Sequence, residues 1–110
     1  MYERSVSHEE STIRSLSRDP EFAAEYINSV FTDGSQDEIM TALRRVSEAY
    51  GGISRLASIT GLNSNTLYRT LSPSGNPELK SLLAILSALG FELSVTPKRE
   101  KHPEGIRAHA

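Results

Sequence analysis

The chain has 110 residues, a length typical of one domain, and only 37% of them are apolar. No apolar run reaches the roughly 18 residues that a membrane helix needs, and the N-terminus lacks the apolar core of a signal peptide. We therefore expect a cytoplasmic protein without membrane contact. The absence of cysteine excludes disulfides, cysteine-ligated zinc and thiol catalysis.

The net charge of −2 is distributed unevenly along the chain. Residues 1–40 carry nine acidic residues and three arginines, a net charge of −6. Residues 41–77 carry four arginines and one glutamate, a net charge of +3, and residues 78–110 carry a net charge of +1. A locally positive segment is what the neutralisation of DNA phosphates requires.

Residues 1–18 are polar and show no sustained apolar periodicity, which is typical of a flexible segment. Two alternatives remain open: the segment becomes ordered on a partner, or Ile13 and Leu16 mark a short helix. We expect the folded domain to span residues 19–97.

Two helices are expected at the start of this domain. Asp19-Pro20-Glu21 combines an N-cap, a proline suited to the first helical position and an acid near the helix dipole. This helix is expected to end at Phe31 or Thr32. Ser35 and Glu38 form a capping-box pattern that opens the second helix, and Gly51-Gly52 predicts its end.

The stretch Ile53–Leu71 predicts two short helices joined at a glycine. Ala57 is small where the two helices would cross, Gly61 permits a left-handed turn, and Leu67 would anchor the second helix in the core. Two crossed helices with a glycine-containing turn form a helix-turn-helix unit, whose second helix enters the DNA major groove.

The outward side chains of this unit suit DNA contacts. Asparagine can bond adenine, arginine can bond guanine, and serine can reach a base or a phosphate. The first turn of a helix also offers free backbone N–H groups to a phosphate. The predicted DNA-binding residues are Ser54 and Arg55 on phosphates, Asn63 as the N-cap of the second helix, Ser64, Asn65 and Arg69 on bases, and Tyr68.

For Tyr68, contact with the DNA backbone and packing against the last helix are equally expected. Residues 72–77 form a dense turn signal, in which Asn76 would cap and Pro77 would start a leucine-rich helix that Gly90 closes.

Residues 91–96 alternate apolar and polar side chains up to Pro97, which predicts a half-buried β-strand. A lone strand needs a partner for its backbone groups. The simplest partner is the same strand of a second copy, antiparallel across a two-fold axis, which predicts a homodimer. The N-terminal segment and the sheet of a partner protein remain alternatives. Residues 98–110 are expected to be a disordered tail.

Three stretches resemble a known family: DPEFAAEYINSVF, YGGISRLASITGL and NTLYRTLSPSGNPELKSLLAILSALGFELSV. Together they are similar to the antidote (antitoxin) component of bacterial addiction modules, in the lambda-repressor-like, Xre-type helix-turn-helix class. The resemblance implies an all-α bundle of about five helices, here with one short C-terminal β-strand. It also implies a dimer that binds double-stranded DNA at its own operator and neutralises a small ribonuclease-like toxin.

Other function classes have weaker support. All three histidines lie in the expected tails, and no glycine-rich phosphate loop or metal-ligand cluster is present, so we expect no enzyme, cofactor or metal. A stand-alone phage-type or chromosomal Xre-family regulator without a toxin remains an alternative. A protein-interaction module that uses the fold only as a scaffold is another.

Overall fold

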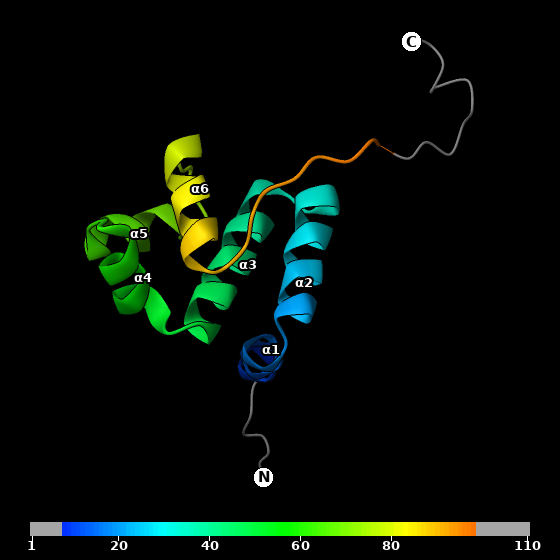
Figure 1. The fold of residues 1–110 in the computed structure, drawn as a ribbon, viewed down its shortest axis with the longest axis horizontal. Helices are drawn as coiled ribbons and strands as arrows, with labels where there is room; N and C mark the ends of the chain where they lie inside the picture. Colours follow the sequence, from blue (N-terminus) through cyan, green and yellow to red (C-terminus); the bar gives the residue numbers. More distant parts are fainter. Residues whose placement is uncertain (1–7, 99–110) are drawn as a thin grey trace.

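The structure, a computed structural model, describes residues 8–98 and folds that range into six α-helices (Figure 1). The sequence predicted an all-helical bundle, and the described part of the chain confirms it. The helices are α1 (His8–Arg18), α2 (Pro20–Asp33), α3 (Gln36–Ala49), α4 (Gly52–Thr60), α5 (Ser64–Thr70) and α6 (Leu79–Ala88).

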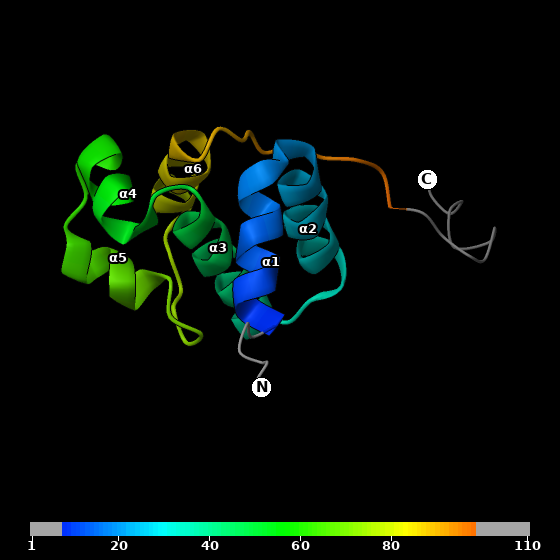
Figure 2. The same cartoon turned by 90° about the horizontal axis from the view of Figure 1, so that it is seen from below.

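Helix α3 is the centre of the fold. It packs against α1 and α2 on one side and against α4 on the other, and α4 also contacts α5 and α6. Figure 2 shows α1 and α2 on one flank of α3 and α4 and α5 on the opposite flank. The core is built from the apolar faces of these helices, with fully or almost fully buried side chains at Leu16, Leu43, Val46, Ile53, Leu56, Leu67, Leu71 and Ile85.

Residues 8–18 form helix α1 instead of the flexible segment expected for residues 1–18, in agreement with the alternative that Ile13 and Leu16 mark a short helix. Residues 8–18 are helical, and the Leu16 side chain has an exposed fraction of 0%. Ile13, three residues earlier, is half-buried on the same face. The segment is too polar to predict a helix from composition alone, but one leucine packed against α3 and α2 is enough to order it. The first seven residues lie outside the described range.

The predicted helix starts at α2 and α3 are confirmed. The Asp19 carboxylate accepts hydrogen bonds from the backbone N–H groups of Glu21 (3.0 Å) and Phe22 (3.3 Å). At α3, the Glu38 carboxylate accepts from the N–H of Ser35 at 2.9 Å, which completes the capping box. Helix α2 continues to Asp33, slightly beyond its expected end.

Helix α6 begins at Leu79, two residues later than predicted. The preceding loop is held in place because the Gln36 side chain donates to the Gly75 carbonyl at 3.0 Å. Gly75 also packs so closely against the Thr70 carbonyl that a Cβ would collide with it. Pro77 therefore completes this loop, and the first helical bond runs from Leu82 N–H to the Glu78 carbonyl at 2.9 Å.

The end of α6 fixes the direction of the residues that follow. Gly90 adopts a left-handed φ of 92°, as predicted for the closing glycine. Its N–H donates to the Ser87 carbonyl (3.0 Å), and the Phe91 N–H donates to the Leu86 carbonyl (2.8 Å), which is the Schellman pattern. The Phe91 ring then lies against the Tyr50 ring, with 6.0 Å between centroids.

The predicted strand over residues 91–96 is not formed in the described chain. These residues are extended, but no ladder of strand hydrogen bonds is present between residues 8 and 98. A strand requires a second segment to accept and donate these bonds, and every other described segment is helical or a helix connection. The predicted tail at 98–110 lies, beyond Lys98, outside the described residues.

Candidate nucleic-acid interface

The start of α4 depends on two glycines with positive φ, at 109° for Gly51 and 83° for Gly52. The aliphatic stem of Arg55 lies across Gly51, in space that a Cβ at Gly51 would occupy. Ser54 and Arg55 are both exposed in the first turn of α4. The glycine pair thus turns the chain from α3 into α4 and leaves room for the aliphatic stem of Arg55 at the start of α4.

The turn between α4 and α5 has the predicted left-handed glycine. Gly61 has a φ of 77°, and its N–H donates to the Ala57 carbonyl at 2.9 Å. The Thr60 hydroxyl accepts from the Leu62 N–H (3.1 Å) and donates to the Leu56 carbonyl (2.8 Å). The threonine, unusual where an aliphatic residue is expected, thus satisfies polar backbone groups in the turn.

Helix α5 is capped as predicted by Asn63. Its side-chain oxygen accepts from the N–H groups of Asn65 (2.8 Å) and Thr66 (3.2 Å). Leu67, with an exposed fraction of 0%, and Leu71 hold the opposite face of the helix in the core. The side of α5 away from these leucines carries the exposed side chains of Asn65, Thr66, Tyr68 and Arg69. Ser64 has helical spacing to Leu67 and Leu71, but it is exposed because it lies in the first turn of α5.

The structure therefore brings all seven predicted residues to the surface of one α4–α5 unit, although their roles differ. The Asn63 side-chain oxygen is used within the protein as the cap. The Tyr68 ring, 47% exposed, lies under the guanidinium of Arg44 from α3, at 4.9 Å from Cζ to the ring centroid. Arg44 is a neighbour that neither expectation for Tyr68 had included.

Arg44 joins the surface of the α4–α5 unit through two contacts. Besides stacking on Tyr68, its Nε donates to the Glu48 carboxylate at 3.3 Å, one helical turn away. The spacing of Arg44 and Glu48 was visible in the sequence, but the approach of α3 to α5 was not. Arg45, its sequence neighbour, donates instead to the Tyr26 hydroxyl at 3.1 Å, on the α2 side of α3.

The charge of this unit is uniform. Residues 50–77 contain two arginines and no acidic residue, so every formal side-chain charge on α4, α5 and their connections is positive. The α1–α2 flank is opposite in sign: residues 8–33 contain six acidic residues and two arginines, a net charge of −4. The helix pair with polar, hydrogen-bonding side chains on its outer face is thus also the pair that attracts a polyanion.

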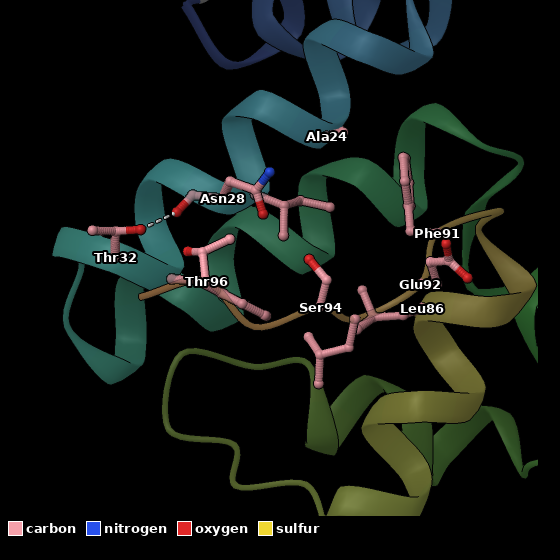
Figure 3. Close-up of a pocket in the computed structure, with 11 residues that line it drawn as sticks. Ala24, Asn28, Thr32, Leu86, Phe91, Glu92, Ser94 and Thr96 are labelled. Atoms are coloured by element: carbon pink, nitrogen blue, oxygen red, sulfur yellow. Dashed lines mark hydrogen bonds between the residues drawn. The ribbon is translucent and has the colours of Figure 1, made fainter. Parts of the chain in front are cut away.

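A second surface feature lies on the other flank, between α2 and residues 91–96 (Figure 3). It is a groove of about 390 Å³. In Figure 3, Asn28 and Thr32 of α2 face Ser94 and Thr96 of the extended segment. The remaining lining residues are Ala24, Ile27, Phe31, Leu86, Phe91, Glu92 and Leu93.

Residues 8–98 contain neither a metal-binding cluster nor a membrane-spanning helix. No cluster of three or more histidine, aspartate or glutamate side chains there is arranged to hold a metal ion. None of the helices in this range is both long and apolar enough to cross a membrane.

The comparison with protein families decides the family. The model of the family described as "Probable addiction module antidote protein" matches residues 10–97, which include all six helices except the first residues of α1. This chain belongs to that family. The match begins within α1 and ends at Pro97, so the family pattern includes both the helix and the extended segment that flank the predicted bundle.

The antidote-family protein also resembles an uncharacterized protein of Haemophilus influenzae strain Rd. The two are 27% identical over 74 residues, which cover 67% of this chain and 75% of the relative. No solved structure matches the chain.

Proposed function

We propose that this antidote-family protein is the antitoxin of a toxin–antitoxin module and a sequence-specific DNA-binding repressor of its own operon. In this proposal α4, the Gly61 turn and α5 form a lambda-repressor-like, Xre-type helix-turn-helix. The observation that carries it is the sidedness of α5: Leu67 and Leu71 are buried, and an acid-free polar face points outward.

The outward face supplies each kind of contact that sequence-specific binding requires. Ser64, Asn65 and Arg69 read base edges in the major groove. Ser54 and Arg55, both exposed in the first turn of α4, hold a phosphate there, where the helix start offers free backbone N–H groups. Tyr68 contributes its exposed hydroxyl edge to the DNA backbone, and Asn63 keeps α5 in place.

One α5 helix covers too few base pairs to select an operator, so the proposal includes a homodimer. Two copies of α5 then enter successive major grooves, about 34–36 Å apart. A dimer bound at the promoter represses transcription by occupying it.

The toxin contact is proposed for the acidic α1–α2 flank. A small ribonuclease must bind polyanionic RNA and is therefore basic at its active surface, and this flank has the opposite charge. Because the acidic flank and the α4–α5 unit lie on opposite sides of α3, toxin and DNA would not compete for the same side chains.

DNA binding is tested by fluorescence anisotropy on a labelled duplex from upstream of the gene, with a scrambled duplex as control. The Asn65→Ala/Arg69→Ala variant should lose the preference for the upstream duplex while keeping its helical circular dichroism. Equal binding of both duplexes by the wild-type protein, or an unchanged preference in the variant, would reject the assignment.

The toxin contact is tested by co-expression with the short reading frame beside the gene. Deleting the whole acidic flank is unsuitable, because α1 and α2 supply the buried Leu16, Ala23 and Ile27. The exposed acids Glu21 and Glu25 can instead be reversed to lysine, with Glu78→Lys as the control far from this flank. Rescue of growth should fail only in the Glu21/Glu25 variant. If no neighbouring frame is toxic, the protein is a stand-alone regulator.

A further inference from the structure

Residues 92–98 form an extended segment that has no paired strand within residues 8–98. They leave α6 through the fixed turn at Gly90, run extended, and make no backbone hydrogen bond with another described residue. Their apolar side chains are uncovered: Leu93 is 43% exposed and Val95 is 94% exposed. An extended segment with unpaired backbone N–H and C=O groups and exposed apolar side chains can pair with another strand.

We infer that the occupant is the same segment of a second copy, in one particular antiparallel register with Val95 opposite Val95 on the two-fold axis. The inference rests on the proposed dimer and adds its geometry. The register follows from three independent features of residues 91–98: the alternation of their side chains, the position of Pro97 and the position of the two charges.

The alternation excludes half of the possible registers. Residues directly opposite each other in an antiparallel pair point to the same face of the ribbon. In a regular strand, Phe91, Leu93, Val95 and Pro97 would occupy one face and the polar residues between them the other. If the two-fold axis passes through a residue, apolar side chains lie opposite apolar side chains. If it passes between two residues, each apolar side chain lies opposite a polar one.

Pro97 fixes the hydrogen-bonding phase. A proline has no N–H to donate, so it must lie at a non-hydrogen-bonded position of the pair. Hydrogen-bonded and non-hydrogen-bonded positions alternate along an antiparallel pair. Leu93 and Val95 are therefore also non-hydrogen-bonded, and the backbone groups of Ser94 and Thr96 form the hydrogen bonds between the strands. At a non-hydrogen-bonded position the opposite side chains come closest, so the two Val95 side chains cover one another on the axis.

The charges select among the remaining registers. With Val95 on the axis, Glu92 of each copy lies opposite Lys98 of the other, and Ser94 lies opposite Thr96. Opposite charges across a strand pair stabilise it, and the two-fold axis produces the Glu92–Lys98 pair twice. With Ser94 on the axis, Lys98 would instead face Gly90, which is already held in the left-handed turn. With Thr96 on the axis, Glu92 would lose its opposite charge.

The register is tested by single cysteines, because the natural chain has none. Val95→Cys, Ser94→Cys and Thr96→Cys place one thiol on each of the three candidate axes, and all three positions are exposed, so the fold is unaffected. Under glutathione buffer at low protein concentration, Val95→Cys should form a disulfide-linked dimer in high yield, since only there do two Cβ atoms face each other at bridging distance. Ser58→Cys, exposed on α4, measures random collision.

Charge exchange provides a second measurement that involves no covalent bond. Glu92→Lys and Lys98→Glu should each weaken the dimer roughly tenfold in sedimentation equilibrium, because each sets like charges opposite one another at two places. The double variant Glu92→Lys/Lys98→Glu should recover the wild-type dissociation constant.

The outcomes separate this inference from the proposed function. Preferential cross-linking of Ser94→Cys or Thr96→Cys, or a double variant no tighter than either single one, overturns the register. A wild-type protein that is a monomer throughout overturns the pairing itself. The upstream-duplex assay is a separate measurement: a preference for the upstream duplex without strand pairing would overturn this inference alone, and pairing without that preference would overturn the proposed DNA binding alone.

Discussion

The two flanks of α3 are built alike and charged oppositely. Each consists of two helices that bury apolar residues against the shared core, through Leu16, Ala23 and Ile27 on one side and Leu56, Leu67 and Leu71 on the other. The exposed faces differ: residues 8–33 have a net charge of −4, whereas residues 50–77 have a net charge of +2. The two flanks thus resemble each other in packing and differ in surface charge, and it is this difference on which the proposed assignment of different partners rests.

The largest expected change is a loss of folding stability, which tests whether both flanks contribute to the same hydrophobic core. Leu16→Ala on α1 and Leu67→Ala on α5 should each lower the free energy of unfolding by about 2–5 kcal/mol, since both side chains are fully buried. Urea denaturation followed by circular dichroism measures it, with exposed Ser15→Ala as the control. A loss below about 0.5 kcal/mol for Leu16→Ala, the value usual at the surface, would mean that α1 is not part of the core.

The next largest expected change is a loss of DNA affinity when a positive charge is removed, and it should occur only for the α4–α5 flank. Arg69→Ala should weaken operator binding by about 1–3 kcal/mol and relax the preference at one base position. Arg18→Ala removes the same charge from α1 and should leave binding nearly unchanged, because Arg18 lies on the other flank. Anisotropy titrations on the upstream duplex and on single-base variants measure both. Equal losses from the two substitutions would indicate a general electrostatic effect.

Two matched N-caps allow a finer comparison. Asp19 caps α2 and Asn63 caps α5, and each accepts two backbone hydrogen bonds. Asp19→Ala and Asn63→Ala should each lower the free energy of unfolding by about 0.5–2 kcal/mol. Only Asn63→Ala should also weaken DNA binding, because it loosens the helix that is proposed to read bases. Denaturation and anisotropy on the same samples separate the two consequences.

The smallest expected change is in the pH dependence of stability, and it concerns Tyr50, which caps the C-terminal end of α3. Burial raises the pKa of the Tyr50 hydroxyl, and the Asp19 carboxylate raises it further. Because the pKa is higher in the folded state, this group contributes stability below its unfolded pKa of about 10, and the contribution is lost as pH rises through the folded value.

Tyr50→Phe should therefore remove part of the loss of stability above about pH 10. At neutral pH it should leave stability unchanged or slightly higher, since the buried hydroxyl has no hydrogen-bond partner among the described residues. Urea titrations at pH 7 and pH 10.5 measure the difference. An unchanged pH dependence in the variant would show that Tyr50 is not the group that titrates.

Local signals in the sequence predicted much of this fold. The caps at Asp19 and Asn63 and the turn at Gly61 depend on a few neighbouring residues, and each was found where it was expected. The start of α6 was misplaced because Gln36, far away in sequence, holds the loop at Gly75. Helix α1 was only one of the alternatives for residues 1–18, because its order depends on packing against α3 and α2.

The candidate site shows the same division between local and distant information. Helical spacing alone predicted that Asn65, Tyr68 and Arg69 would face outward while Leu67 faced the core. The stacking of Arg44 on Tyr68 needed the packing of α3 beside α5, which no local pattern contains. Strand formation at residues 91–96 depends on a second segment, and no other part of residues 8–98 pairs with them.

If the protein binds DNA as the proposed dimer, the turn at Gly90 has a consequence for the spacing of the two DNA half-sites. Its two hydrogen bonds and the Phe91–Tyr50 contact tie the extended segment rigidly to α6, and α6 packs on α4. In the proposed dimer, this link determines the distance between the two α5 helices before any DNA is bound. One residue inserted after Gly90 would move every side chain of the paired segment to the opposite face of the two-stranded ribbon. The insertion should therefore change the spacing of half-sites that the dimer accepts, and it should leave the bases read in each half-site unchanged.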